Sequence, residues 1–449
     1  MAADPNAPPN AHSATMRAFV QWIRLAAPYI HAFRGKTFVI AFGGEVVADD
    51  TFLGIVHDLN LLHSLGVRLV VVHGSRPQIE AILAQQDIEN RYAFGLRVTD
   101  AETMDCVLEA SGQVRSRIEA MLSLGIANSP MAGARNRVSS GNFITAKPIG
   151  VLEGIDMQLT GEVRRVDVEA ITLRLDDGEI VIISPLGYSP TGEIFNLSLE
   201  EVATQVAVRI DAHKLVFLME TEGVRNTRRH LLTELSTKDA EAILANRSKL
   251  PPDVQHYLPC AIRACENGVK RTHLISRHVD GALLLELFTR DGVGTMVAAA
   301  PLAHIRPATI DDVGGILAVI EPLEEEGVLV RRSRERLEME IERFVVAEHD
   351  GAIIGCAALY AFFDEKVGEL AALAVHPDFR REGYGEALMN EIETRARKLK
   401  LVDLFVLTTR TSQWFLERGY RNASVAELPK AKQALYNFQR KSQVYRKKL

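Results

Sequence analysis

An apolar strand that runs into a basic, glycine-containing loop and then into a helix constrains this chain more than any other segment. Residues 369–375 read Glu-Leu-Ala-Ala-Leu-Ala-Val, and the loop contains Arg380-Arg-Glu-Gly-Tyr-Gly385. Leu388, Ile392 and Ala396 then recur at helical spacing, so one helix face is buried. Glycines let the backbone approach a ligand, and a helix start offers unpaired N–H groups and partial positive charge. The segment therefore predicts a pyrophosphate cradle, and a turn merely shaped by its glycines is the alternative.

Length and charge limit the classes of protein that this chain can belong to. Its 449 residues, 47% of them hydrophobic and 24% charged, exceed one core, so two or three domains are expected. A net charge of −6 gives no electrostatic reason to bind nucleic acid or an anionic membrane. No apolar run is long enough to span a bilayer, and the Pro/Asn/Ala-rich start does not resemble a signal peptide. We expect a cytoplasmic protein whose residues 1–15 are disordered.

The cysteines and histidines show no metal-binding pattern. Cys106, Cys260, Cys265 and Cys356 lack metal-ligand spacing, and none of the 13 histidines belongs to a cluster such as His-Glu-x-x-His. No metal is predicted, and the thiols are expected to be structural and reduced.

Strands and helices alternate through residues 16–299. Expected elements are helix 16–34 with a kink at Pro28, strand 38–42, helix 50–65, strand 68–72, helix 76–86, strand 179–183, helix 199–210, strands 214–219 and 272–275, and helix 282–288. Val/Ile-rich strands in this order imply a parallel sheet that helices cover on both faces.

A second domain is expected over residues 304–449. The proline-containing segment 299–309 has little periodicity and reads as a linker followed by a first strand. After it we expect helices 310–321 and 333–343, a hairpin of strands 344–348 and 352–363, the strand, loop and helix described above, strand 403–408, helix 412–418 and a strand near 436–445.

The pattern Arg-x-x-Gly-x-Gly after a strand resembles the acetyl-CoA loop of the GNAT N-acetyltransferases. The resemblance implies that the central strand splays from its neighbour and that one of its backbone N–H groups binds the thioester oxygen. The implied contacts of acetyl-CoA are Leu373, Ala374, Val375, Arg380, Arg381, Glu382, Gly383, Tyr384, Gly385 and Glu386.

Glu369 begins this strand on the side where an acceptor amine is expected. An α-ammonium group must lose a proton before it attacks, and a carboxylate can take that proton directly or through a water. A solvated strand-end glutamate is the alternative. Thr408 or a water is the candidate acid for the leaving thiolate, and the sequence does not decide between them.

Longer blocks of the second domain resemble the bacterial N-acetylglutamate synthases. These blocks are Arg331–Glu338, Ile354–Tyr360, Leu404–Thr411, Trp414–Tyr420 and Leu435–Ser442. The implied acceptor is L-glutamate, whose two carboxylates suit the forked donors of arginine. The implied glutamate ligands are Arg331 or its neighbour Arg332, Arg410, Arg440 and Ser442. A solvated basic tail is the alternative for the C-terminal residues.

Residues 16–299 resemble the amino-acid kinase fold, and within it acetylglutamate kinase. The matching segments are Phe38–Gly44, Leu69–Ile79, Lys214–Leu218, Asp280–Thr289 and Asp291–Thr295. Kinases of this family carry a lysine where this chain has Ala41, and their glycine-rich loop is replaced here by His73-Gly-Ser-Arg-Pro77. Phosphoryl transfer depends on such electrostatics, so we expect no kinase activity.

Arginine-inhibited members of this kinase family bind L-arginine under a kinked N-terminal helix. The matching positions are Tyr29, Lys214, His278, Glu286, Gly292, Gly294 and Thr295. Glu286 is expected to pair with the guanidinium group, although Glu286 can simply be solvated and His278 can simply cap a strand. The helix around residues 22–33 has an apolar face, so it is expected to pair with another surface. The resemblance to arginine-sensitive relatives implies that this pairing forms a homo-hexamer.

The resemblances together predict an α/β protein, an N-terminal amino-acid kinase-like parallel-sheet sandwich joined to a C-terminal GNAT domain. Its expected activity is acetyl transfer from acetyl-CoA to L-glutamate, the first step of arginine biosynthesis, with feedback inhibition by L-arginine. Direct transfer in a ternary complex is expected, because no cysteine or serine is set up as a nucleophile. The alternatives are an acetylglutamate kinase or bifunctional synthase/kinase, a non-catalytic arginine sensor, and an acetyltransferase with another acceptor.

Overall fold

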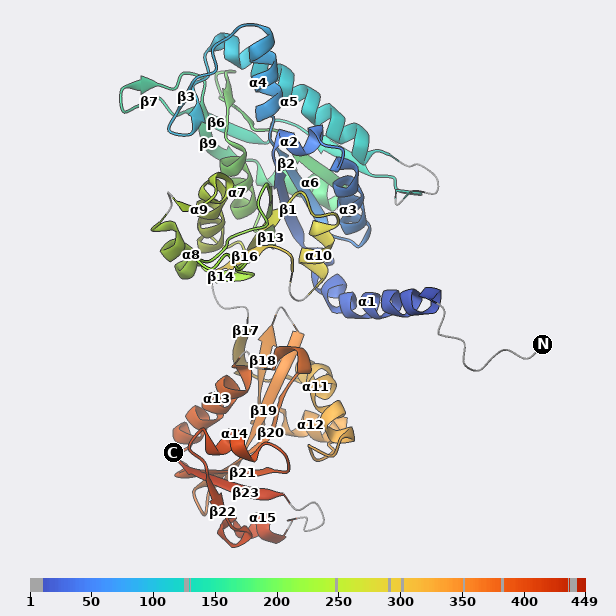
Figure 1. The fold of residues 1–449 in the computed structure, drawn as a ribbon, viewed down its shortest axis with the longest axis vertical. Helices are drawn as coiled ribbons and strands as arrows, with labels where there is room; N and C mark the ends of the chain where they lie inside the picture. The colour runs from blue at the N-terminus through green and yellow to red at the C-terminus, as the bar shows by residue number, and fades with distance from the viewer. Residues whose placement is uncertain are drawn as a thin grey trace, which may run out of the picture. The chain divides into compact units, whose positions relative to one another are not determined.

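The chain forms two compact units that divide between residues 300 and 301 (Figure 1). The computed structural model describes residues 11–124, 129, 131–246, 249–289, 292–299, 303–349, 352–380, 383–434, 436 and 442–449. The division lies within the segment 299–309, which the sequence analysis reads as a linker followed by a first strand.

An eight-stranded sheet forms the centre of the larger unit. Its order is β14 (Glu234–Ser236), β16 (Thr295–Ala298), β15 (Arg271–Ser276), β13 (Lys214–Met219), β1 (Thr37–Phe42), β2 (Arg68–His73), β10 (Glu179–Ile183) and β5 (Arg137–Ser140). All neighbouring strands are parallel except β15 and β16.

Helices cover both faces of this sheet, because its strands are apolar on both sides. Phe38, Ile40 and Phe42 pack with one group of helices, whereas Val39 and Ala41 pack with the other. The first group is α1 (Ala11–Phe33), α3 (Phe52–Ser64), α5 (Ala101–Leu122) and α10 (Ala282–Phe288). The second is α6 (Val168–Asp176), α7 (Leu199–Arg209), α8 (Thr237–Leu244) and α9 (Pro252–Glu266). The expected parallel sheet with two covered faces is confirmed.

A smaller layer, which the sequence analysis did not anticipate, lies beyond the carboxyl ends of the central strands. It contains a sheet of β12 (Ile194–Asn196), β11 (Leu186–Tyr188), β6 (Ile144–Pro148) and β9 (Gly161–Val166), and the hairpins β3 (Tyr92–Ala93) with β4 (Leu96–Arg97) and β7 (Val151–Leu152) with β8 (Ile155–Asp156). Helices α2 (Gly44–Ala48) and α4 (Arg76–Gln85) begin at the ends of β1 and β2.

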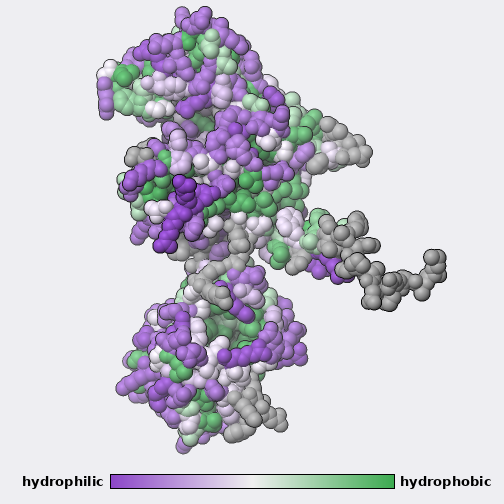
Figure 2. Space-filling model, in the orientation of Figure 1, coloured by the Kyte–Doolittle hydropathy of each residue, from purple (hydrophilic) through white to green (hydrophobic). Residues whose placement is uncertain are grey.

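Helix α1 begins at Ala11, so residues 11–15, predicted to be disordered, are helical instead. Its C-terminal half is anchored by Phe33, whose ring lies 5.2 Å from Phe38 and 5.8 Å from Phe288. Figure 2 shows hydrophobic surface on this helix, and the part of it before Ala26 exposes large apolar side chains: Met16, Phe19, Val20, Trp22, Ile23 and Leu25. A helix with such an exposed face is expected to have a partner.

The smaller unit is built on a seven-stranded sheet. Its order is β17 (Ala303–Pro307), β18 (Phe344–His349), β19 (Ala352–Phe362), β20 (Val367–Val375), β21 (Asp403–Thr408), β23 (Gln443–Lys448) and β22 (Arg421–Ala423). Only β20 and β21 are parallel neighbours. Helices α13 (Tyr384–Lys398) and α14 (Ser412–Leu416) pack on one face, and α11 (Val313–Glu325) and α12 (Arg334–Glu340) on the other. A short helix, α15 (Lys430–Ala434), precedes β23.

An ion pair fastens the start of α11 to the edge of this sheet. The Arg306 guanidinium donates to Asp312 at 2.7 and 2.8 Å and to Glu348 at 2.6 Å, and the Thr309 amide also donates to Asp312. The hydrogen bonds from Arg306 outweigh burial and lower the pKa of Asp312 from 3.8 to about 2. The charged carboxylate therefore stabilises the fold above pH 3.8, and this stabilisation is lost as the pH falls toward 2.

We expect Asp312→Asn to lower the free energy of unfolding of this unit by about 2 kcal/mol at neutral pH. Urea denaturation at neutral pH and near pH 3 measures the effect, and the difference from wild type should shrink at the lower pH. The exposed neighbour Asp311 provides the control substitution Asp311→Asn. An equal deficit at both pH values would show that the charge of Asp312 contributes nothing.

Candidate functional site

The centre of the smaller unit is a divergence of β20 from β21. These strands pair only from Val367 opposite Asp403 to Glu369 opposite Phe405, although β20 continues to Val375 and β21 to Thr408. Their pairing therefore ends at Glu369, at the place where the resemblance implies that the two strands splay.

A β-bulge in β20 begins within this divergent stretch. Two residues, Ala372 and Leu373, lie opposite the single residue Ala357 of β19, and Ala372 has a φ of 51°. A bulge increases the local twist and bends the strand that carries it. The bulge therefore accounts physically for the divergence, and it falls on Leu373, where the thioester-binding N–H group was expected.

The glycine-containing loop reaches the start of α13 in the geometry that the sequence predicted. Gly383 occupies the N-cap position with a φ of 88°, which favours glycine. Among the described residues no side chain caps this helix start, and a helix N-terminus of this kind is a usual place for anions to bind. Arg380 is exposed, and its Nε–H donates to the Val375 carbonyl at 3.4 Å. Arg381 and Glu382 lie outside the described residues.

Glu369 is not a solvated strand end. It is 7% exposed, and its carboxylate lies 2.7 Å from Nζ of Lys432 on α15. Its cross-strand neighbour on β19 is Tyr360, so the two side chains share a sheet face. The Tyr360 hydroxyl donates to Glu340 at 2.6 Å. Lys432 was missed by the sequence analysis, because a lysine in a five-residue helix has no distinguishing pattern.

The predicted glutamate ligands differ in their surroundings. Burial and then the bond to Glu340 raise the pKa of Tyr360, whereas the charge of nearby Arg332 acts in the opposite direction. The Arg332 amide donates to Glu324 at 3.0 Å, and its guanidinium donates to the Val330 carbonyl at 2.9 Å. Its neighbour Arg331 is exposed.

The remaining predicted residues surround the end of β21. The Thr408 hydroxyl accepts from the Thr411 amide at 3.1 Å and lies 2.8 Å from the Thr411 hydroxyl, so it stabilises the turn that leads from β21 into α14. Arg410 is exposed and pairs with Glu326 at 3.0 Å. Ser442 is 8% exposed and directly precedes β23, which pairs with β21. Arg440 lies outside the described residues.

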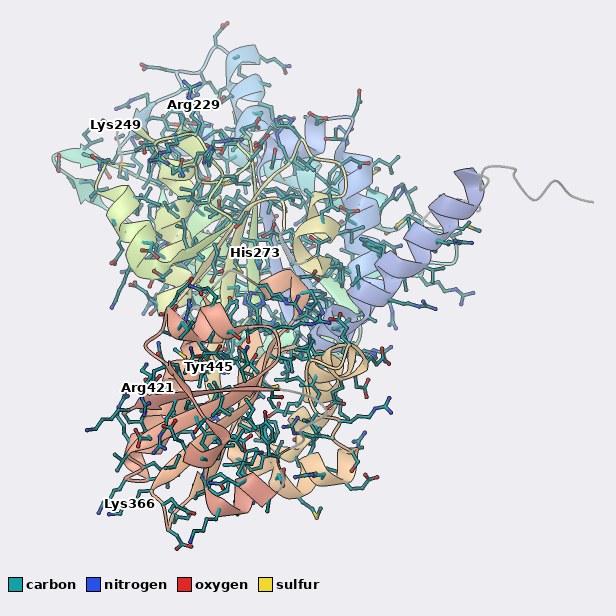
Figure 3. The ribbon with its side chains drawn as sticks, turned by 60° about the horizontal axis from the view of Figure 1, so that its bottom comes forward. Arg229, Lys249, His273, Lys366, Arg421 and Tyr445 are labelled. Carbon is teal, nitrogen blue, oxygen red and sulfur yellow. The ribbon has the colours of Figure 1, made fainter. Side chains whose placement is uncertain are left out.

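A buried charged cluster lies in the larger unit where the effector was expected. Nζ of Lys214 lies 3.2 Å from Nε2 of His273, and Nδ1 of His273 lies 2.7 Å from Glu286 (His273 is labelled in Figure 3). The other Glu286 oxygen accepts from the Val293 amide at 2.7 Å and the Gly294 amide at 2.9 Å. Lys214, His273 and Glu286 are 2%, 3% and 8% exposed.

The cluster holds one negative and one positive group around a neutral imidazole. Burial, then the charge of Lys214, lowers the pKa of His273 to about 4. Burial acts to raise the pKa of Glu286, but the bonds from His273 and the two amides outweigh it and lower that pKa. His273 therefore accepts at Nε2 from Lys214 and donates from Nδ1 to Glu286.

The other predicted effector residues divide into those near the cluster and those elsewhere. A Cβ at Gly292, whose φ is 60°, would lie 2.5 Å from the Glu286 carboxylate. Thr295 is buried, and its hydroxyl accepts from the Val224 amide at 2.8 Å. Tyr29 lies on α1 one turn before Phe33, whose ring centre is 5.0 Å from Nζ of Lys214.

His278 is not part of this cluster. Its ring bonds to Glu220 at 2.9 Å, and half of its side chain is exposed. His273 takes the place expected for it. The sequence signal that could have identified His273 is a titratable residue inside the apolar strand β15.

At the position of the kinase lysine, this chain has a buried alanine, and a carboxylate lies over the neighbouring glycine. Ala41 is fully buried, and the carboxylate of Glu45 folds back over Gly43, where an added Cβ would lie 2.1 Å from it. Burial raises the pKa of Glu45. The Arg76 guanidinium lies 5.1 Å from the centre of the Tyr92 ring.

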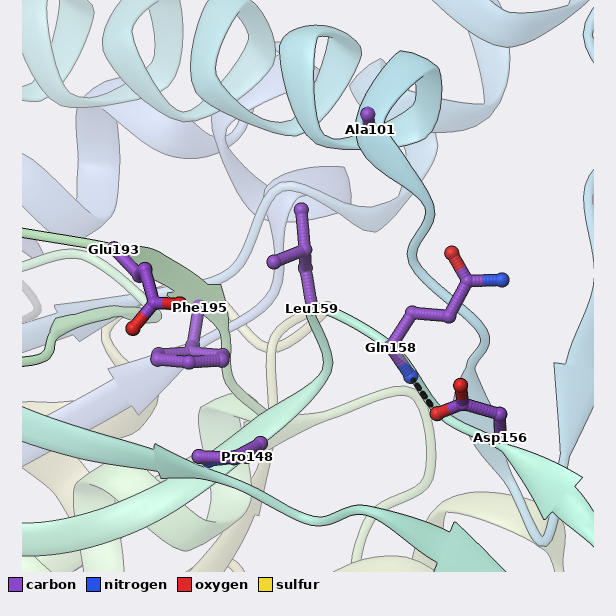
Figure 4. A pocket seen from close by; sticks show the side chains of 7 residues that line it. All are labelled: Ala101, Pro148, Asp156, Gln158, Leu159, Glu193 and Phe195. Carbon is purple, nitrogen blue, oxygen red and sulfur yellow. Dashed lines mark hydrogen bonds between the residues drawn. The ribbon is translucent and has the colours of Figure 1, made fainter.

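An open hollow of about 580 Å³ lies in the smaller layer of the larger unit (Figure 4). Its carboxylates are bound locally: Asp156 accepts from the Gln158 amide at 3.0 Å, and Glu193 accepts from Ser189 and Thr191. Hydrogen bonds from Thr191 and then Ser189 lower the pKa of Glu193. These charges do not converge on a ligand position, and none of the sequence-predicted site residues lines the hollow.

Neither a metal-binding cluster nor a membrane-spanning helix is present within the described parts of the chain. No group of three histidine, cysteine or acidic residues there could hold a metal ion. No helix among the described residues is long and apolar enough to cross a bilayer. All four cysteines are buried and free.

Comparison with known proteins matches both units. The amino acid kinase family model matches residues 36–276, and the acetyltransferase (GNAT) family model matches residues 316–419. N-acetylglutamate synthase from Neisseria gonorrhoeae, complexed with coenzyme A and L-arginine, is 39% identical, with a TM-score of 0.87 over 96% of this chain and 99% of that one. Its complex with coenzyme A and N-acetyl-glutamate, at the same identity and coverage, gives a TM-score of 0.61.

These matches confirm the predicted fold and the resemblance to N-acetylglutamate synthases. The amino-acid acetyltransferase of Pseudomonas syringae pv. tomato is 54% identical over 96% of this chain and all of its own length. That of Ectopseudomonas mendocina is 53% identical over 97% of this chain, again along its full length. Because both units and their order are shared from end to end, the chain belongs to the amino-acid acetyltransferase family.

Proposed function

We propose that this chain transfers the acetyl group of acetyl-CoA to the α-amine of L-glutamate, forming N-acetyl-L-glutamate and CoA, under inhibition by L-arginine. The observation that carries this proposal is the meeting, at β20, of a bulged and divergent strand, a glycine-capped helix start and a buried glutamate. The 39% sequence identity to the N-acetylglutamate synthase of Neisseria gonorrhoeae, over 96% of this chain, supports this acceptor.

The backbone of the smaller unit binds the co-substrate in this proposal. The first N–H groups of α13, at Gly383 to Glu386, hold the pyrophosphate, and Arg380, Arg381 and Glu382 complete the loop. The gap between β20 and β21 takes the pantetheine arm. An N–H group between Leu373 and Val375 polarises the thioester carbonyl.

Glu369 accepts the proton of the α-ammonium group, directly or through a water. The amine then attacks the thioester carbon and the carbon–sulfur bond breaks. The second proton of the attacking nitrogen passes to the leaving thiolate through water or Thr408, which gives the amide and the CoA thiol. Transfer is direct, because the nearby thiol is a poor nucleophile. Cys356 is fully buried, and burial raises its pKa to about 12.

Arginine side chains near this face hold the two carboxylates of L-glutamate. Arg332 is favoured over Arg331 because its charge acts on Tyr360, the cross-strand neighbour of Glu369. Arg410, Arg440 and Ser442 complete the proposed set around the end of β21. The acceptor test is CoA release with L-glutamate, L-glutamine or D-glutamate. Release with L-glutamate alone is expected, and equal release with L-glutamine would exclude recognition of two carboxylates.

The larger unit is proposed to bind L-arginine at the cluster of Lys214, His273 and Glu286, with Tyr29, Gly292, Gly294 and Thr295 around it. Glu286 would exchange its bond from His273 for the ligand's guanidinium. The exposed apolar face of α1 is proposed to join subunits of a cytoplasmic homo-hexamer, since that face has no cover in the monomer.

We expect no phosphorylation of N-acetylglutamate by this chain. The uncharged Ala41 cannot stabilise a transferring phosphoryl group, and the Glu45 carboxylate lies over Gly43 and repels phosphate. ADP formation from ATP and Mg²⁺, with and without N-acetylglutamate, measures the activity, and an acetylglutamate kinase serves as the positive control. ADP formation that depends on N-acetylglutamate would support the bifunctional alternative instead.

A further inference from the structure

We propose that Trp414 and Arg418 form a side wall of the acetyl-CoA channel, in which the indole contacts the pantetheine arm and Arg418 neutralises Glu386 beside the pyrophosphate. This inference rests on the proposed function, because it concerns how the same site holds its co-substrate. Neither side chain was predicted to contact a ligand from the sequence.

The indole of Trp414 lies where the proposed channel begins. A Cβ added at Gly385 would be 3.6 Å from Cζ2 of Trp414 and 3.9 Å from Cγ2 of Val375. The end of β20, the first turn of α13 and the indole therefore meet around one glycine. Helix α14 follows β21, and α13 follows β20, so the indole reaches from one divergent strand toward the other.

Arg418 fixes the indole from its other side. Its guanidinium carbon lies 4.1 Å from the centre of the Trp414 ring, and its Nη1 donates to the Trp414 carbonyl at 3.1 Å. Its Nη2 donates to Glu386 on α13 at 3.0 Å. Arg418 therefore links α14 to α13 and holds the ring in a defined orientation.

The charges in this bridge suit a phosphate-bearing ligand. Glu386 lies in the first turn of α13, where its carboxylate would repel a bound pyrophosphate. The ion pair with Arg418 offsets this negative charge without blocking the N–H groups of the helix start. The Nε–H of Arg418 is buried and has no hydrogen-bond partner among the described residues.

The chain has only two tryptophans, Trp22 and Trp414, which makes a direct test simple. In the full-length Trp22→Phe variant, all tryptophan emission comes from Trp414. We expect its intensity to change saturably with added CoA, over the same concentrations that calorimetry gives for binding. Trp414→Phe, with Trp22 retained, should lose that change. Unchanged emission in Trp22→Phe at saturating CoA would overturn the proposal.

Kinetics test the role of Arg418 independently. Arg418→Gln should raise the acetyl-CoA KM about tenfold while leaving the L-glutamate KM within about twofold. Arg421→Gln is the matched control, because Arg421 is an exposed arginine of β22, paired with Glu427 at 3.3 Å (Figure 3). An unchanged acetyl-CoA KM with a lowered melting temperature would show a purely structural bridge and overturn the proposal.

These measurements separate this inference from the proposed function. CoA binding is read without any acceptor, so a failure of L-glutamate to react would leave the fluorescence result intact. Conversely, if L-glutamate is acetylated normally but Trp414 fluorescence does not change on addition of CoA, the proposed acetyltransferase function would stand. Only the proposed contact of Trp414 with the pantetheine arm would be wrong.

Discussion

Replacing Glu369 by glutamine is expected to lower kcat by about a hundredfold or more, because the amide cannot accept the proton of the α-ammonium group. Glutamine has nearly the same size and keeps a carbonyl oxygen for Lys432, which lies 2.7 Å from the carboxylate. Packing around this position should therefore change little. CoA thiol release at saturating substrates measures kcat, and the acetyl-CoA KM should stay close to that of wild type.

The matched control for this variant is Glu342→Gln, an exposed glutamate of the same unit. Its kcat should equal that of wild type. If Glu369→Gln keeps the wild-type kcat across the pH range of the enzyme, Glu369 is not the base. A water held by other groups would then have to remove the proton.

The second large effect is expected at Glu286. Glu286→Gln should raise the L-arginine concentration needed for half-inhibition by about a hundredfold, because a carboxylate pairs with a guanidinium through two acceptors and an amide offers only one. Each rate is divided by the rate of the same variant without L-arginine. The Val293 and Gly294 amides also lose an oxygen acceptor in one orientation of the amide, so the melting temperature is measured in parallel.

Two histidines distinguish the structure from the sequence-based expectation at this site. His273 bonds directly to Glu286, whereas His278 is half exposed and bonds to Glu220. L-Arginine should therefore inhibit the His278→Gln variant as strongly as wild type, whereas it should inhibit the His273→Gln variant less. If only the His278→Gln variant lost its sensitivity to L-arginine, His278 would belong to the L-arginine site, as the sequence analysis expected.

The sequence predicts the central elements of both units well, because burial and periodicity determine them. Strands β1, β2, β10, β13 and β21 and helix α10 lie within a residue or so of their expected bounds. The smaller layer of the larger unit was missed because most of its strands are only two or three residues long. Such short strands show no clear hydrophobic alternation.

The candidate site was predictable only where a ligand imposes a backbone pattern. Gly383 was identified because its positive φ favours glycine. The bulge was not, because it falls on Ala372 and Leu373, two ordinary residues that carry no signal for the φ of 51° at Ala372. Lys432 and His273 could not be paired with Glu369 and Glu286 from the sequence, since those contacts join separate elements.

The most direct measurement of the central claim is CoA release from acetyl-CoA, with and without L-glutamate and with and without L-arginine. The account predicts release that requires L-glutamate and is suppressed by L-arginine. Release that ignores L-arginine would contradict the role proposed for the larger unit. No release with L-glutamate would contradict the proposed acceptor and leave the chain an acetyltransferase of another amine, or a protein that only binds its ligands.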